Sequence, residues 1–156
     1  MEELLIQLEY GEGPIWRKYF DVETKRHHTG IPIVDNDEIA QRLNDEIQDM
    51  ESSYYEFNSH DMPLWINGEK AWEEMPKKLY LLVKLKERLE EINDGSYTIV
   101  DYETSEIIRC LNPEKFHRKE ERTVDPELKR LIEHYIAQGE KVKEATIKAV
   151  KDMYSK

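Results

Sequence analysis

The residues best suited to metal chemistry are histidines and aspartates in segments predicted to be loops or turns. They are His27, His28, His60 and Asp61, with Asp35 and Asp37 close to the first pair in sequence. Imidazole and carboxylate groups can bind divalent metal ions, and together they could support a small metal-dependent enzyme. Their spacing matches neither a pair of histidines on one helix nor a Cys/His zinc motif. A metal site is therefore kept as an alternative, and no metal or cofactor is expected.

Other signatures of catalysis are missing from the sequence. Gly11-Glu12-Gly13 is followed by Pro14 and a strand-like segment, without the later glycine and helix start of a phosphate-binding loop. No serine has a nucleophile-elbow context, and Cys110 lies in an apolar stretch where packing is the expected role. A binding protein is therefore expected in preference to an enzyme.

The charge of the chain is unevenly distributed. Residues 1–108 contain 25 acidic and 11 basic residues, a net of −14, whereas residues 109–156 contain 9 acidic and 12 basic residues, a net of +3. A strongly acidic body repels nucleic acid and anionic lipid and attracts cationic proteins. The basic run Lys115–Arg122 is interrupted by Glu120 and Glu121, so a solvated linker is expected there and direct nucleic-acid binding is not.

The second candidate site combines carboxylates with aromatic rings. Asp45 and Asp49 lie one helical turn apart, opposite the apolar stripe of a predicted helix. Rings that fill pockets and acids that pair with Lys or Arg are typical of an interface for a basic partner. The predicted partner-binding residues are Asp45, Asp49, Tyr55, Glu56, Asp61, Trp65 and Trp72. In the alternative interpretation, the tryptophans cover the core and the charges are only solvated.

The elements that must position these residues predict an α+β fold. Apolar residues alternate over 4–10 and again over 16–22, which predicts an N-terminal β-hairpin around Gly11–Pro14. Asp35 or Asp37 is expected to cap a helix over 39–57, where apolar residues recur every third or fourth position. A second helix is expected from near Pro76 to Ile92, and it would form an antiparallel pair with the first.

The remaining third of the chain predicts one more hairpin and a helix. Strands are expected at Tyr97–Val100 and Ile107–Leu111, forming a second short hairpin that completes a small sheet. The C-terminal helix begins at Asp125-Pro126 and is expected to bend or split at Gly139. The predicted organisation is an acidic α+β domain over 1–111, a charged linker over 112–124 and a helical segment over 125–156.

A cytoplasmic location is expected for this chain. Cys110 is the only cysteine, so no internal disulfide can form, and the N-terminus lacks the basic and apolar pattern of a signal peptide. No apolar run approaches the ~20 residues that a transmembrane helix requires. The membrane is therefore not an expected partner.

Four segments carry a resemblance to other proteins: Tyr10–Trp16, Thr29–Ile47, Tyr54–Trp65 and Leu89–Thr104. There the chain resembles small uncharacterised proteins of Gram-positive bacteria, some of which are associated with toxin immunity. The resemblance covers about residues 6–108 and implies a toxin-neutralising role, but it assigns no binding residue.

The leading hypothesis is an acidic cytoplasmic protein that inhibits a basic partner, most directly an immunity protein against a nuclease toxin. A cationic nuclease cleft could be blocked by acidic groups and a few aromatic anchors. The alternatives are the metal-dependent enzyme, a structural or regulatory homo-oligomer formed through the C-terminal stripe Leu128–Met153, and a DNA-mimic inhibitor.

Overall fold

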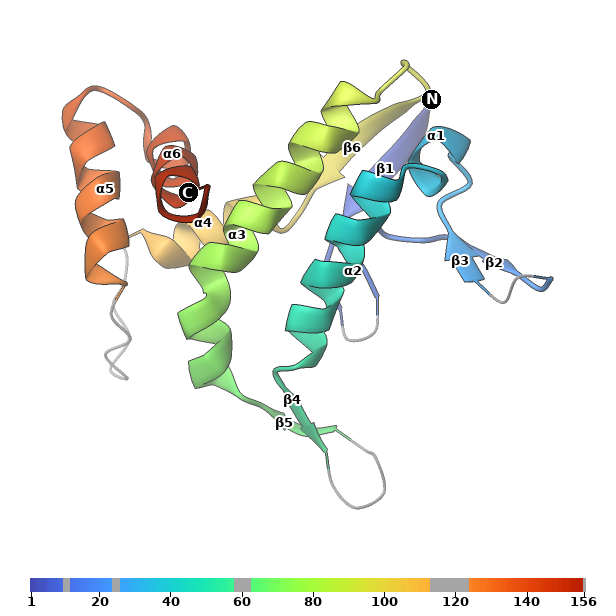
Figure 1. The fold of residues 1–156 in the computed structure, drawn as a ribbon, viewed down its shortest axis with the longest axis horizontal. Helices are drawn as coiled ribbons and strands as arrows, with labels where there is room; N and C mark the ends of the chain where they lie inside the picture. Colours follow the sequence, from blue (N-terminus) through green and yellow to red (C-terminus); the bar gives the residue numbers. More distant parts are fainter. Residues whose placement is uncertain (10–11, 24–25, 58–62, 113–123, 156) are drawn as a thin grey trace.

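The computed structural model describes residues 1–9, 12–23, 26–57, 63–112 and 124–155 (Figure 1). Within these ranges it is an α+β structure of short strands and longer helices, as predicted. The elements in chain order are β1 (Glu2–Ile6), β2 (Tyr19–Asp21), β3 (Arg26–His28), α1 (Pro32–Asp35), α2 (Glu38–Ser52), β4 (Tyr55–Phe57), β5 (Pro63–Ile66), α3 (Gly68–Glu91), β6 (Tyr97–Asp101), α4 (Thr104–Leu111), α5 (Pro126–Ala137) and α6 (Val142–Tyr154).

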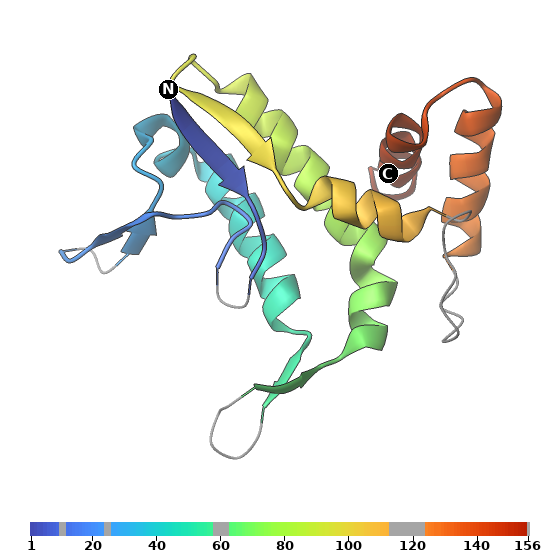
Figure 2. The ribbon, with the colours of Figure 1, turned by 180° about the vertical axis from the view of Figure 1, so that it is seen from behind.

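A parallel pair of strands lies at the centre of the fold. Among the described residues, β1 pairs only with β6, and Leu4 and Ile99 are partners in the register. Helices α2 and α3 run antiparallel, as predicted, and cover one face of this sheet (Figures 1 and 2). Parallel strands need a long connection, and here it contains both of these helices.

The predicted N-terminal β-hairpin is wrong. After β1 the chain turns back, and the Trp16 N–H donates to the Leu5 carbonyl at 2.9 Å, but this return makes only isolated bridges such as Ile6 with Ile15. Residues 19–21 instead form β2, which pairs antiparallel with β3 in the segment predicted as a turn. Alternating apolar residues identify a strand without identifying its partner, so the pairing with β6 was not predicted.

Helix α2 begins as predicted and ends earlier. The Asp37 carboxylate accepts the Ala40 N–H at 2.8 Å and caps the helix. Buried residues at spacings of three and four, including Leu43 and Ile47, form its inner face. The helix ends at Ser52 instead of residue 57, and the chain continues into β4, which pairs antiparallel with β5. Aromatic residues such as Tyr55 suit a strand as well as a helix, which explains the error.

Helix α3 begins earlier than predicted. It starts at Gly68, and the Asn67 side chain accepts the Lys70 N–H at 3.1 Å as its cap. Pro76 therefore lies inside the helix and not at its first position. At the other end, the Arg88 guanidinium makes two hydrogen bonds to Asp37, with Nε at 3.0 Å and Nη2 at 2.7 Å from its carboxylate oxygens. This contact joins the end of α3 to the start of α2.

The second predicted hairpin is wrong in its second half. Residues 97–101 form strand β6, but residues 107–111 belong to helix α4. The Asp101 carboxylate accepts the N–H groups of Glu103 and Thr104, both at 3.0 Å, and thereby stabilises the start of this helix. Ile107, Ile108 and Leu111 share its buried face; in so short an apolar segment this helical spacing is hard to distinguish from a buried strand.

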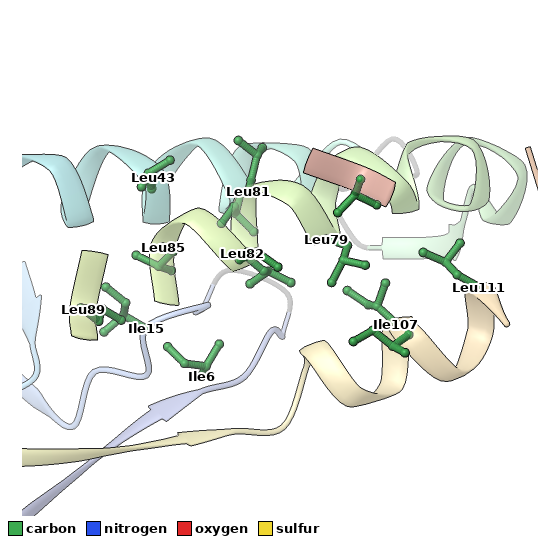
Figure 3. Close-up of a cluster of buried hydrophobic side chains, with 14 of the residues drawn as sticks. Ile6, Ile15, Leu43, Leu79, Leu81, Leu82, Leu85, Leu89, Ile107 and Leu111 are labelled. Carbon is green, nitrogen blue, oxygen red and sulfur yellow. The ribbon is translucent and has the colours of Figure 1, made fainter. Parts of the chain in front are cut away.

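The C-terminal segment is a helical hairpin that packs on the rest of the protein. Asp125 caps α5, and the predicted break at Gly139, which has φ +95°, is confirmed. Helix α6 packs against α3 and α4, and its residues Ala149 and Val150 belong to the same hydrophobic core as Ile6. Figure 3 shows part of this core, where Ile6 of β1 points toward leucines of α3 that include Leu82 and Leu85. The predicted division into two folded segments is untested, because most of the predicted linker lies outside the described residues.

No helix in the described part of the chain has the length and apolarity needed to cross a membrane.

We predict that Asp37→Ala lowers the free energy of unfolding by about 2–3 kcal/mol, because it removes a helix cap and leaves Arg88 unpaired. The hydrogen bonds from Arg88 hold the pKa of Asp37 below its usual value. This stabilisation is therefore complete above the unfolded pKa of about 3.9 and is lost as the pH falls through the lower folded pKa. Urea unfolding between neutral pH and about pH 2 would measure it.

Asp37→Asn is the control: it can keep the cap and should lose mainly the charge-dependent part of the stabilisation. Equal stability of the wild type and both variants would contradict the prediction.

Candidate functional site

The outward face of α2 is acidic. Ala40, Leu43, Asn44 and Ile47 are buried against the core, so the opposite side of the helix points to solvent. Four carboxylates and one base are exposed on that side: Glu38, Arg42, Asp45, Glu46 and Asp49. The helical period dictates this arrangement, because residues three or four positions apart share a face. Asp45 and Asp49 therefore lie together on the exposed side, as predicted from the sequence.

The loop that follows β1 lies beside α2 and adds two further acids. The Asn44 side chain accepts the Ile15 N–H at 2.8 Å, and the Gln48 amide donates to the Gly13 carbonyl at 2.9 Å. These hydrogen bonds hold the loop along the flank of the helix. Glu9 and Glu12 of this loop are exposed. We call the combined surface the α2 acidic face; it consists of Glu9, Glu12, Glu38, Asp45, Glu46 and Asp49.

The carboxylates of the α2 acidic face have no ion-pair partner among the described residues. None of the six forms an ion pair with another described residue, and Arg42 is the only base in the α2 sequence. Many other carboxylates are paired, as in Asp37 with Arg88, Glu51 with Lys78, Asp101 with Lys86, and Glu87 with Lys151. The α2 acidic face therefore groups six exposed carboxylates without ion pairs on one surface, where they can attract a positive partner.

The aromatic part of the predicted interface is less clearly placed. Tyr55 lies in β4 and Trp72 lies in α3; both are half-buried, and Trp72 packs against the core. Glu56 and Trp65 are register partners in β4 and β5, but the structure describes only their backbone. Asp61 lies outside the described residues. Of the seven predicted residues, Asp45 and Asp49 are the two placed on the α2 acidic face.

The alternative metal site can be examined only around His28. Its Nδ1 lies 3.7 Å from an Asp35 carboxylate oxygen, and its ring lies beside Tyr19 with centroids 5.8 Å apart. Asp35 also accepts hydrogen bonds from the Thr29 hydroxyl and the Gly30 N–H, which stabilise the turn after β3. In the part of the chain that the structure describes, no three histidine, cysteine or acidic side chains converge as metal ligands would. The side chains of His27, His60 and Asp61 are not described, so this alternative is untested.

A buried ion pair joins α2 to α3 and had no signal in the sequence. Lys78 is 8% exposed, and its ammonium lies 3.0 Å from a Glu51 carboxylate oxygen and 5.2 Å from the Tyr54 ring centroid. Close by, the Glu103 carboxylate accepts the Leu8 N–H at 2.6 Å, and burial raises the pKa of Glu103. A lysine among the apolar residues of a helix gives no indication of the acid that will pair with it.

The same buried region contains a tyrosine close to a carboxylate. Burial raises the pKa of Tyr54 above its usual range, and the neighbouring Glu74 and Glu51 carboxylates raise it further. The Tyr54 hydroxyl and the Glu74 Oε2 are close, but their geometry falls short of a hydrogen bond, and neither has another hydrogen-bond partner among the described residues. Polar atoms buried in this way are typically bridged by water. We interpret this region as a structural polar cluster that fixes the ends of the two helices.

Comparison with models of known protein families finds no match for this chain, and comparisons with curated proteins and with solved structures find none either.

We predict that Lys78→Met destabilises the fold by about 3 kcal/mol, because Glu51 is left charged and unpaired in a largely buried position. The double variant Lys78→Met with Glu51→Leu removes both charges, so it should recover most of this loss. Urea unfolding of the wild type and both variants measures the difference. If the double variant were as unstable as the single one, the packing of the lysine stem and not the ion pair would be the stabilising contact.

Proposed function

We propose that this chain is a cytoplasmic protein that binds and inhibits a basic protein through the α2 acidic face, in the manner of an immunity protein that neutralises a toxin. The observation that carries the proposal is the group of exposed carboxylates without ion pairs on this face. Six such acids lie together here, so this is a surface where a cationic partner gains by electrostatic attraction.

The spacing of the acids supports this choice. Asp45 and Asp49 are one turn apart, and like charges at that spacing destabilise a helix by a few tenths of a kcal/mol. Binding of a partner's Lys or Arg side chains would relieve this repulsion. The helix is also a rigid support, since its inner residues Leu43 and Ile47 are buried in the core. A rigid, pre-arranged charged surface loses little conformational entropy when it binds.

A nuclease toxin is the partner class that fits this chemistry best. Nucleases hold phosphate groups in cationic clefts, and a convex row of carboxylates on a helix can occupy such a cleft. Opposite charges over this area would raise the association rate, with an effect that falls as salt increases. The arrangement needs neither a metal nor a cofactor.

The role in immunity is tested by growth of a bacterial host that produces the protein encoded next to this chain. We expect that protein to inhibit growth, and co-production of this chain to restore it. A neighbour that inhibits growth equally in the presence and absence of this chain would contradict an immunity role.

The binding surface is tested by charge reversal. We predict that the double variant Asp45→Lys with Asp49→Lys lowers the association rate for that neighbour about tenfold at low salt and reduces the salt dependence of the rate. Surface plasmon resonance over a series of salt concentrations measures both effects. The matched control is Glu133→Lys with Glu144→Lys, which makes the same change in net charge at exposed positions on α5 and α6. Similar losses for the two variants would show that total charge, and not the α2 acidic face, controls binding.

A further inference from the structure

One edge of the β1–β6 sheet is open. The Glu2 N–H donates to the Ser96 carbonyl at 3.3 Å, and the Tyr102 N–H donates to the Ile6 carbonyl at 3.0 Å. In a parallel pair the backbone groups of successive residues point alternately to one side and the other. Thr98 and Val100 therefore direct their N–H and C=O groups toward β1, and Ile99 directs its groups away from β1.

These outward groups have no strand to pair with in the structure. Among the described residues β6 has β1 as its only neighbouring strand, and neither the N–H nor the C=O of Ile99 forms a hydrogen bond. The other edge of the sheet is partly closed, because Trp16 and Pro14 bond to Leu5 and Gln7 of the β1 segment. Exposed edges in natural proteins are commonly protected by lysine, proline or a bulge. β6 contains no proline, its charged residue is Asp101 at the end of the strand, and the Asn93 amide donates to the outward Tyr97 carbonyl at 3.1 Å, so the centre of the edge at Ile99 is the unprotected part.

In the part of the chain that the structure describes, no helix covers the face of the sheet opposite α2 and α3 (Figure 2). Leu5 and Val100 are register partners on this face; both are half-buried, and Thr98 beside them is exposed. Purely parallel sheets are almost always covered on both faces and contain more strands than two. A two-stranded parallel sheet with an open edge is therefore an incomplete element.

We propose that β6 pairs with β6 of a second copy of this chain, antiparallel, around a two-fold axis that passes beside Ile99. The N–H of Ile99 then donates to the carbonyl of the partner's Ile99, and the reverse bond is equivalent. Tyr97 pairs with the partner's Asp101 on either side of the axis. The Tyr97 carbonyl already accepts the Asn93 Nδ2 at 3.1 Å, and its second lone pair accepts the partner's N–H. The result is a continuous four-stranded sheet in the order β1-β6-β6-β1, in which the outward backbone groups of both edges are satisfied.

The charges on α3 favour a second copy as the occupant. The Tyr97 hydroxyl donates to the Leu89 carbonyl, and the Lys86 ammonium lies 3.7 Å from an Asp101 carboxylate oxygen. Helix α3 therefore runs antiparallel to β6, and its turn Lys86–Leu89 lies over the part of β6 between Tyr97 and Asp101. A two-fold axis beside Ile99 exchanges the two ends of this turn between the copies.

This exchange brings opposite charges together. Lys86 and Glu90 are one turn apart on the same side of α3, and Glu90 is exposed with no ion pair to a described residue. In the dimer, Lys86 of each copy comes level with the partner's Glu90. Two such contacts offset part of the repulsion between acidic chains at this edge. The α2 acidic face lies above β1, on the side of the sheet away from the axis, so dimer formation leaves it free.

The proposal predicts that the full chain sediments as a dimer of the 18.7 kDa monomer over a micromolar concentration series. Ile99→Pro removes the outward N–H and leaves the bonds to β1 in place, so it should yield a monomer. Glu90→Lys places two positive charges level with each other across the axis and should raise the dissociation constant about tenfold. Glu73→Lys is the matched control, because it makes the same charge change at an exposed position of α3 away from this edge.

Each outcome decides the proposal. A wild type that is monomeric at every concentration would overturn it, as would equal effects of the Glu90 and Glu73 variants. If Ile99→Pro lowers the melting temperature so far that the chain unfolds, the dissociation constants of the Glu90 and Glu73 variants still decide whether the dimer forms through β6.

The register is tested by cross-linking in a Cys110→Ser background. In the proposed dimer Thr98 faces the partner's Val100 in a pair with Cα atoms about 4.5 Å apart, which is within disulfide range. The variant with Thr98→Cys and Val100→Cys should therefore form a covalent dimer when air and copper oxidise the thiols. Thr98→Cys alone places the thiols on diagonal neighbours, about 7–8 Å apart, and should remain largely monomeric on a non-reducing gel. A dimer that does not cross-link in the double variant would use another surface.

Because neither test involves a toxin, the dimer and the proposed function can fail independently.

Discussion

The parallel pairing of β1 with β6 is the constraint on which the rest of the structure depends. It brings the N-terminal strand beside a strand almost a hundred residues later, with Leu4 opposite Ile99. The chain between them must cross over the sheet, and it does so as α2 and α3. This crossover determines which side of α2 is buried and therefore where its carboxylates point. The same pairing uses one side of β6 and leaves the other side open.

Charge in this protein has two roles that are separated in space. Two half-buried acids that join α2 to α3 are paired with a base: Arg88 binds Asp37, and Lys78 binds Glu51. Such pairs cost desolvation energy, so their value lies in fixing how α2 and α3 meet. The acids of the α2 acidic face have no such partners among the described residues. They can therefore interact with another molecule without disturbing the fold.

The sequence predicted the local features that depend on neighbouring residues. The cap at Asp37, the inner stripe of α2, the strand at Tyr97 and the break at Gly139 all follow from side-chain chemistry within a few positions. Long-range features were missed. The partner of β1 is set by the packing of the whole chain. The segment Ile107–Leu111 is apolar enough for a strand or a helix, and the Asp101 carboxylate favours the helix because it accepts an N–H group of the first turn of α4.

The candidate site follows the same rule. The exposed position of Asp45 and Asp49 could be predicted, because it requires only the helical period and the apolar stripe. The contribution of Glu9 and Glu12 could not, since it depends on a loop more than twenty residues away, whose Gly13 carbonyl accepts from Gln48 and whose Ile15 N–H donates to Asn44. The unpaired state of Ile99 was equally hidden, because it depends on which strand lies next to β6.

The two proposed interactions, pairing of two β6 edges and binding of a basic protein, respond to salt in opposite directions. Both responses depend on the negative charge of the chain, and this couples the two interactions. Two copies with a net charge of −11 repel each other over a Debye length, whereas strand pairing depends on hydrogen bonds that salt affects little. Added salt therefore favours the pairing of two β6 edges and weakens attraction between the α2 acidic face and a basic protein. A bound basic partner would itself neutralise part of the charge and lower the repulsion between copies. By linkage, a dimer should then bind its basic partners more tightly than the monomer does, even though the two surfaces do not touch.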